Sequence, residues 1–236
     1  NVLKEWEFLV RTMKVKEIAI QDDLFNTNIK RAEEICDLIV KHDLVVPWSL
    51  PNGMRADIIS ERLLTKMKQA GCYRIAYGVE TGNAEVMKKI GKNIAFDTIE
   101  DAFKLTHRLG IKTLMFMIIG HPWDTEETIK ETIDFTIKIN PDFVQFTRAN
   151  PIPGSRYYNM AKEKGFAVKS WEDLDHYATI GAAIGTLTPE QIERNLKMAY
   201  RRFYMRPKML WKLATDKNTY MSFPGLLRAG FHFFVN

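Results

Sequence analysis

The hydrophobic residues of this chain follow two alternating patterns. Short apolar runs rich in Ile, Val and aromatic residues predict β-strands. Between them lie longer stretches with apolar residues three or four positions apart, which predict amphipathic helices. Strand and helix alternate five times, and strand starts are about 30–40 residues apart, the spacing of βα units. The predicted strands cover residues 17–21, 45–50, 74–80, 111–119 and 142–147.

This alternation predicts an α/β fold with parallel strands and right-handed crossovers, a parallel barrel or a large part of one. Asn28 and Ser60 are expected to cap the helices after the first two strands. From residue 165 onward the pattern changes, and Thr188 marks a clear helix start. We therefore expect a partial barrel over residues 1–164 and a mostly helical extension over residues 165–236.

The stretch RIAYGVETG, residues 74–82, organises the predicted barrel. Its apolar residues predict a buried strand, and Gly78 and Gly82 allow a tight turn at its end. Glu80 then stands where a parallel strand leads into a helix, the edge at which α/β folds bind ligands. The alternative interpretation is that Glu80 only caps the following helix.

Composition narrows the functional classes. The chain has 236 residues and a net charge of +5, which is too small an excess to indicate nucleic-acid binding by itself. Cys36 and Cys72 are its two cysteines, too far apart for a Cys-x-x-Cys pair. We interpret both as core residues of a protein in a reducing compartment, which favours the cytoplasm.

Two further features concern processing and membranes. The longest strongly apolar run, residues 114–119, is far too short to cross a bilayer, and no signal peptide is visible. The chain begins inside a helical pattern at Asn1, so we expect it to be the later part of a longer protein.

Polar residues follow all five predicted strands. Because the carboxyl ends of parallel strands share one edge, these residues should converge on one rim. Carboxylates near an arginine suit a zwitterionic ligand, and a carboxylate near a ribose can accept from both hydroxyls. The rim residues are Asp22, Asp23, Asn52, Arg55, Glu80, His121, Arg148 and Asn150.

The same residues also have purely structural interpretations. Asp22 and Asp23 could form only a turn, and Arg55 could simply pair with Asp57. His121 precedes a proline and is as well explained by a turn as by a catalytic base. The spacing alone therefore predicts a rim site whose purpose stays open.

Five motifs in order resemble the radical S-adenosylmethionine (radical SAM) enzymes, closest to the branch with an N-terminal cobalamin-binding domain. Each motif is weak alone, but their order over residues 1–160 is specific. The helical segment 188–210 also resembles that branch. The motifs are IQDDLF (20–25), MRAD (54–57), AGCYRIAYGVETG (70–82), FMIIGHP (116–122) and NPIPGS (150–155).

The resemblance implies a partial TIM-like (β/α)6 barrel in which a [4Fe–4S] cluster binds S-adenosylmethionine and generates a 5′-deoxyadenosyl radical. Asp22 and Asp23 would face the methionine amino group, and Arg55 its carboxylate. Glu80 would hold the ribose. Backbone at Ile118–Gly120 and Phe146–Thr147 would line the adenine. Catalytic residues are not assigned.

The departures from the family are large. The three-cysteine cluster loop and the first strand are missing, so five βα units are present and the chain should be inactive by itself. The cobalamin domain is missing too. Trp123 and Asp124 stand where many relatives have Gly-Glu, which weakens any role for that turn.

We therefore interpret the chain as the C-terminal portion of an iron–sulfur, S-adenosylmethionine-dependent enzyme, with cobalamin a further candidate cofactor. It would methylate or rearrange an unactivated small-molecule or lipid-like substrate, and its missing N-terminal part would be a partner. One alternative is a tRNA-modifying methylthiotransferase, although no RNA-binding module follows the barrel. Another is a non-catalytic barrel scaffold without a cluster.

The C-terminal segment mixes basic and aromatic residues. Such a mixture can lie on an anionic membrane, so peripheral membrane contact is one prediction. The favoured interpretation is a solvated basic face with its aromatic rings packed on the neighbouring domain. The aromatic residues are Tyr200, Phe203, Tyr204, Trp211, Phe223, Phe231, Phe233 and Phe234.

Overall fold

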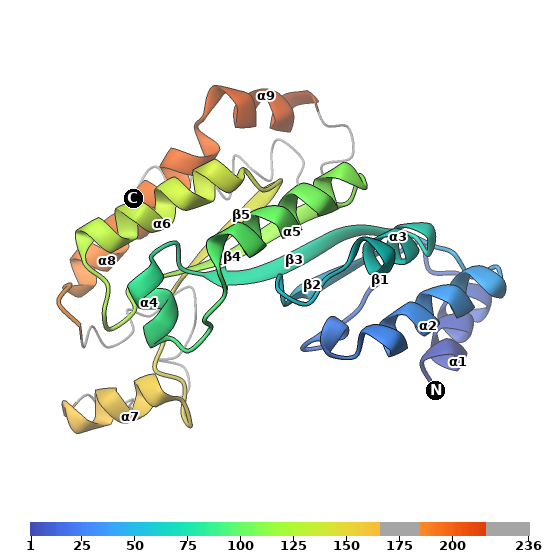
Figure 1. Ribbon diagram of the computed structural model, residues 1–236, viewed down its shortest axis with the longest axis horizontal. Helices are drawn as coiled ribbons and strands as arrows, with labels where there is room; N and C mark the ends of the chain where they lie inside the picture. Colours follow the sequence, from blue (N-terminus) through green and yellow to red (C-terminus); the bar gives the residue numbers. More distant parts are fainter. Residues whose placement is uncertain (166–184, 216–236) are drawn as a thin grey trace. The chain divides into compact units, whose positions relative to one another are not determined.

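The computed structural model describes residues 1–165 and 185–215 and contains a five-stranded sheet in the order β1–β2–β3–β4–β5 (Figure 1). The strands are parallel and alternate with helices along the chain, so the predicted partial TIM-like barrel is confirmed. The strands are β1 (Ile18–Ala19), β2 (Trp48–Met54), β3 (Cys72–Glu80), β4 (Lys112–Ile119) and β5 (Phe143–Arg148).

The first two strands differ from their predicted bounds. β1 has two residues, whereas the pattern predicted residues 17–21. β2 begins at Trp48 rather than residue 45 and continues to Met54. The sequence Pro51-Asn52-Gly53 looks like a turn, but a register shift between Leu50 and Met54 keeps these residues in the strand as an irregularity. Gly53 permits it with a φ of +105°.

The chain divides into two compact units. Unit 1 contains Asn1–Val79, Lys92–Met117 and Ile139–Gln145, and unit 2 contains Glu80–Gly91, Ile118–Lys138 and Phe146–Asn236. The carboxyl ends of β3, β4 and β5 therefore belong to unit 2. The division at residue 164 into barrel and extension stays a prediction.

The core of unit 1 is built around a fully buried tryptophan. Trp48 donates from Nε1 to the Ala70 carbonyl at 2.9 Å, and its ring meets Trp6 edge-on with centroids 6.0 Å apart. Phe25 contacts the same ring from the loop after β1. Burying three aromatic rings together removes a large apolar area from water and so stabilises this unit.

Helices of unit 1 begin where the sequence predicted. Asn28 and Ser60 each accept a hydrogen bond from the backbone N–H three residues on, as N-caps do. The predicted N-terminal helix is split into a short α-helix and a π-helical stretch, Phe8–Thr12. The α-helices are α1 (Val2–Glu7), α2 (Ile29–Lys41), α3 (Glu61–Gln69) and α5 (Phe96–Arg108).

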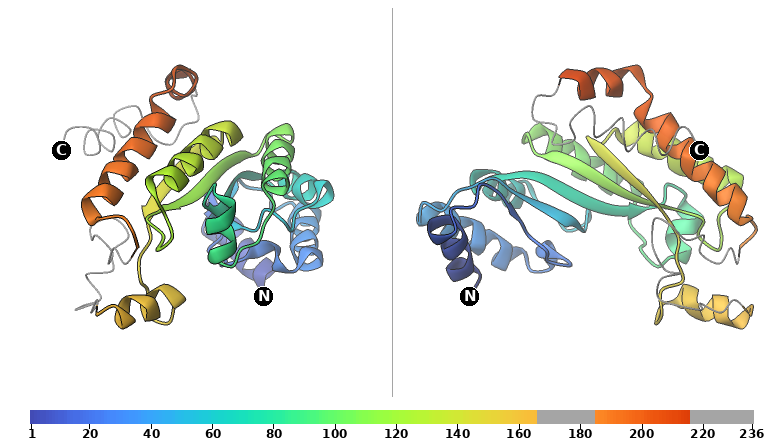
Figure 2. Two further views of the ribbon diagram at one scale, coloured as in Figure 1. Left: turned by 60° about the vertical axis from the view of Figure 1, so that its left-hand side comes forward. Right: turned by 180° about the vertical axis from the view of Figure 1, so that it is seen from behind.

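Unit 2 holds most of the remaining helices. Thr188 and Gln191 form a capping box at the predicted start of α8, which confirms that helix start. α8 runs beside β5 and α6 (Figure 2). Within the described ranges, no helix is long and apolar enough to cross a bilayer. The helices are α4 (Ala84–Lys89), α6 (Glu126–Ile139), α7 (Arg156–Glu163), α8 (Pro189–Tyr204) and α9 (Pro207–Thr215).

Candidate functional site

In unit 1, a buried amide joins the loop after β1 to the loop after β2. Asn26 is fully buried and donates to the Arg55 carbonyl at 2.9 Å and the Ile58 carbonyl at 2.8 Å. The Arg55 N–H donates back to Asn26 Oδ1 at 3.3 Å. The loops that carry Asp22, Asp23 and Arg55 are therefore fixed to one another. No local pattern around Asn26 indicates this role, because its hydrogen-bond partners lie on a loop about 30 residues away.

The aspartates after β1 have unequal surroundings. Asp22 Oδ1 accepts from the Leu24 N–H at 3.1 Å, which is the turn contact of the structural interpretation. Its Oδ2 lies 3.6 Å from an Arg31 nitrogen. Asp23 is exposed. Asp23 is thus the more accessible of the two candidates for a ligand amino group.

Arg55 is paired with Asp57, as its structural interpretation predicted. The guanidinium donates from Nε to Oδ1 at 2.9 Å and from a terminal nitrogen to Oδ2 at 2.6 Å. This bidentate pair lowers the pKa of the Asp57 carboxyl below its ordinary 3.8 and raises the pKa of Arg55. A ligand carboxylate must compete with Asp57 for binding to the Arg55 guanidinium.

The Arg55→Gln variant is expected to raise the pKa of Asp57 towards its ordinary value, because the main cause of the lowering is removed. A depressed carboxyl pKa contributes stability above the unfolded-state pKa and loses it as pH falls through the folded-state pKa. The variant should therefore lose less stability than wild type as the pH falls below the ordinary pKa of 3.8. NMR titration of the Asp57 carboxyl measures the shift, and an unchanged Asp57 pKa would contradict the pairing.

In unit 2, the turn after β3 is clamped on α6. Thr132 Oγ1 accepts from the Gly82 N–H at 3.0 Å and lies 3.2 Å from the Thr81 hydroxyl. A Cβ on Gly82 would lie 2.7 Å from the Thr132 Cα, so only glycine allows this approach. Glu80 leads into the turn with a φ of +75°, a conformation uncommon for glutamate. The clamp fixes the backbone from which the Glu80 carboxylate projects.

The cap of the helix that follows is a different residue. Asn83 Oδ1 accepts from the Val86 N–H at 2.9 Å at the start of α4. The alternative interpretation of Glu80 as that cap is therefore wrong.

The turn after β4 is fixed by a buried carboxylate. Asp124, 2% exposed, accepts from the N–H groups of Gly120 and His121, both at 2.9 Å, and from the Thr128 hydroxyl at 2.9 Å. Burial raises its pKa, against the lowering effects of nearby His121 and these hydrogen bonds. By spacing alone, Asp124 could form a capping box with Glu127 at the start of α6. Its main partners are instead the backbone amides that follow Ile119.

The ends of β4 and β5 are joined directly. The Ala149 N–H donates to the Ile119 carbonyl at 3.0 Å. Phe146 is buried and Thr147 half-buried on β5, and Ile118 is half-buried on β4. The structure thus brings the predicted adenine-lining positions, Gly120 included, onto two bonded strand ends. Glu80 belongs to the same unit.

The other rim residues vary in accessibility. Asn52 is exposed within β2, Arg148 pairs with Glu193 of α8, and polar atoms of His121 and Asn150 are buried. The residues predicted to contact the methionine part of S-adenosylmethionine all belong to unit 1. Those predicted to contact its adenosine part all belong to unit 2.

The cysteines do not fit an iron–sulfur cluster. Both thiols are buried, and burial raises the pKa of Cys36 to about 12 and also raises that of Cys72. Cluster ligands are thiolates, and the cluster loop that the resemblance implies has three of them, whereas the whole sequence has two cysteines. Within residues 1–165 and 185–215, no group of three His, Cys, Asp or Glu side chains could hold a metal ion.

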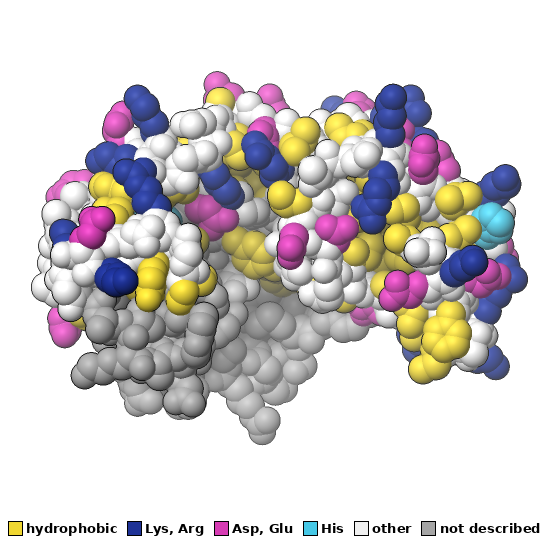
Figure 3. All heavy atoms as spheres, turned by 90° about the horizontal axis from the view of Figure 1, so that it is seen from below, with side chains coloured by type: hydrophobic (Ala, Val, Ile, Leu, Met, Phe, Trp, Pro, Cys, Tyr) yellow, Lys and Arg dark blue, Asp and Glu magenta, His cyan; other side chains and the backbone are white. Residues whose placement is uncertain are grey.

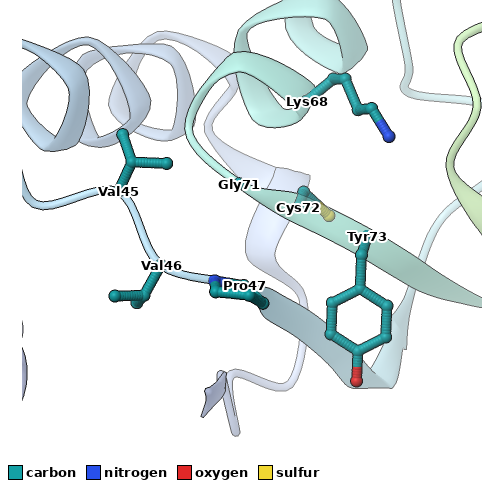
Figure 4. A pocket seen from close by; sticks show the side chains of 7 residues that line it. All are labelled: Val45, Val46, Pro47, Lys68, Gly71, Cys72 and Tyr73. Carbon is teal, nitrogen blue, oxygen red and sulfur yellow. The ribbon is translucent and has the colours of Figure 1, made fainter. Parts of the chain in front are cut away.

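A shallow hollow lies at the amino ends of β2 and β3. Val46, Pro47 and Tyr73 line it, next to the first residue of β3 (Figure 4). In parallel α/β folds, ligands bind at the carboxyl ends of the strands, and this hollow is at the amino ends. It is therefore not the predicted rim site.

The charge distribution on the surface and the burial of aromatic residues in α8 and α9 concern the predicted membrane contact. On the face shown in Figure 3, basic and acidic side chains are interspersed. Phe203 is fully buried and Tyr200 packs on Phe146, as the favoured packing interpretation predicted, whereas Trp211 is 74% exposed. Phe223, Phe231, Phe233 and Phe234 lie outside the described residues, and peripheral membrane contact stays a prediction.

Residues 3–136, more than half of the chain, match the model of the Radical SAM superfamily. The chain is 34% identical over 215 residues to an uncharacterized methyltransferase of Pyrococcus horikoshii, covering 90% of this chain and 46% of that protein. This chain thus spans less than half of that relative's length.

Two solved structures share the fold. The radical S-adenosylmethionine methyltransferase TsrM from Kitasatospora setae, with tryptophan substrate and a SAM analog bound, has a TM-score of 0.60 at 19% identity, over 69% of this chain and 32% of that one. Coproporphyrinogen III oxidase (HemN) from Escherichia coli, a radical SAM enzyme, has a TM-score of 0.57 at 16% identity, over 85% of this chain and 44% of that one.

Proposed function

The chain belongs to the radical SAM superfamily, and we propose that it binds S-adenosylmethionine at the carboxyl ends of its strands as part of a methyltransferase-type enzyme. The observation that carries the proposal is the clamped turn at Glu80–Gly82. It holds a carboxylate at the end of β3, in the same unit as the joined ends of β4 and β5.

The donor set of unit 2 fits the nucleoside part of S-adenosylmethionine. A carboxylate accepts hydrogen bonds from both ribose hydroxyls, the role proposed for Glu80. Backbone at Ile118–Gly120 and Phe146–Thr147 belongs to the joined ends of β4 and β5, where it can line the adenine. Bound S-adenosylmethionine would supply an activated sulfonium, from which a methyl or adenosyl carbon can be released.

In unit 1, Asp22 and Asp23 suit the methionine ammonium, and Arg55 suits its carboxylate once Asp57 is displaced. An Asp57→Asn variant frees Arg55 and serves as a companion measurement for this assignment. Tighter binding of S-adenosylmethionine in that variant, with unchanged binding of methylthioadenosine, would support a carboxylate contact at Arg55.

No catalytic step is assigned to the chain through an iron–sulfur cluster, because Cys36 and Cys72 do not fit one. Cobalamin is a proposal by analogy with TsrM, whose structure contains cobalamin and a [4Fe–4S] cluster. A small-molecule substrate is proposed on the same basis, since TsrM binds tryptophan. Location in the cytoplasm also stays a proposal.

The Glu80→Gln variant tests the nucleotide site. We expect it to weaken binding of both S-adenosylmethionine and methylthioadenosine by about 1.4–2.8 kcal/mol, roughly 10- to 100-fold in Kd, because the hydroxyls lose a charged acceptor. Isothermal titration calorimetry on the protein at its natural length measures both affinities. Glu163→Gln makes the same change at an exposed position on α7 and should bind as wild type does. Equal affinities of Glu80→Gln and wild type would contradict the proposal.

A further inference from the structure

On the outer edge of β5, a side chain forms hydrogen bonds with the backbone N–H and C=O groups of one residue. β5 ends the sheet order in the described part of the chain, so residues facing outward have no strand to bond there. The Tyr200 hydroxyl of α8 accepts from the Phe146 N–H at 3.1 Å and donates to the Phe146 carbonyl at 2.9 Å. One hydroxyl therefore takes the place of a neighbouring strand at this residue.

The alternation of the strand explains why this residue matters. In a parallel strand, successive residues direct their N–H and C=O groups to opposite edges. Ala149 bonds to Ile119 on the β4 side, so Phe146, three positions earlier, faces the outer edge. Thr147, next to Phe146, faces the β4 side. Fixing Phe146 from outside thus fixes the orientation of the backbone at Thr147.

α8 is itself held firmly on unit 2. Arg194 and Asn195 both bond to Glu126 of α6, and Arg202 pairs with Asp134. Nearer its start, Ile192 lies against Gly120, where a Cβ would come within 2.9 Å of it. The helix that carries Tyr200 therefore contacts the ends of both strands that carry the proposed adenine-lining backbone (Figure 2).

We propose that Tyr200 is a positioning residue for adenine recognition, acting through the Phe146–Thr147 backbone. This inference rests on the proposed S-adenosylmethionine site and adds a residue of α8 to those that determine adenine recognition there. The ring of Tyr200 packs edge-on against Phe146, with centroids 5.3 Å apart, so the hydroxyl is held in place by packing as well. Removing the hydroxyl alone breaks both hydrogen bonds to Phe146 and keeps the packing of the ring.

The test is Tyr200→Phe in the protein at its natural length, with Tyr158→Phe on α7 as the matched control. Amide hydrogen exchange over residues 143–149 should accelerate about tenfold in Tyr200→Phe, because two edge hydrogen bonds are lost. The selectivity for methylthioadenosine over methylthioinosine, measured by calorimetry, should fall about three- to tenfold. A purely structural role would weaken both nucleosides equally and leave their ratio unchanged.

The outcomes separate the two proposals. Faster exchange together with lower adenine selectivity supports the positioning role. Wild-type selectivity in Tyr200→Phe overturns it, and leaves the S-adenosylmethionine site standing. If wild type binds neither S-adenosylmethionine nor methylthioadenosine, the site itself fails and the positioning role fails with it. Tyr158→Phe should match wild type in both measurements.

Discussion

Replacing Asp124 by alanine is expected to lower the free energy of unfolding by about 2–4 kcal/mol, because two buried backbone N–H groups lose their acceptor. Asp124 is 2% exposed and binds the amides of Gly120 and His121 together with the Thr128 hydroxyl. Alanine can replace none of these contacts. The loss is a large share of the 5–15 kcal/mol that typical domains have. Urea unfolding measures it.

Two further variants define the cause. Asp124→Asn keeps an oxygen acceptor for the two amides, so it should cost clearly less than Asp124→Ala. Asp101→Ala removes an exposed carboxylate from α5 and should change stability by less than about 0.5 kcal/mol. If Asp124→Ala proves as stable as Asp101→Ala, the buried carboxylate does not hold the turn after β4.

Gly82→Val is expected to cost about 3 kcal/mol or more, because overpacking against a backbone that cannot move away forces the turn off α6. A Cβ at this position would lie 2.7 Å from both the Thr132 Cα and the Phe135 Cβ. The displaced turn carries Glu80, so binding of methylthioadenosine should weaken in parallel. Urea unfolding and calorimetry measure the two effects.

Glycine substitutions can also act through backbone conformation, and a control separates that effect. Gly91 has a φ of +80° and nothing within 4 Å of an added Cβ, so Gly91→Ala costs only backbone strain, about 1–2 kcal/mol. Gly82→Ala should fall between Gly91→Ala and Gly82→Val. Normal stability in Gly82→Val would show that the close approach to α6 is not required.

The sequence predicted the order of the strands better than their bounds. One rule, that the carboxyl ends of parallel strands collect ligand-binding residues, singled out Asp23 and Glu80 as candidates, and the structure has Asp23 after β1 and Glu80 as the last residue of β3. The rule could not say that Arg55 is held by Asp57, nor that β2 continues through Pro51 and Gly53 to Met54. The pairing of Arg55 and the length of β2 depend on which side chains and which neighbouring strand lie close enough to bond in the folded protein.

By itself the sequence determined the order of strands and helices, the helix starts at Asn28, Ser60 and Thr188, and the family to which the motifs belong. These follow from local patterns of period, capping and turn chemistry, which a chain carries in neighbouring residues. Only the tertiary structure decided the contacts that hold the site, those of Asn26, Asp124 and Tyr200. Asn26 and Tyr200 bind backbone groups 29 and 54 residues away, so no local pattern encodes their contacts. Asp124 binds nearby amides, but its burial is a result of tertiary packing.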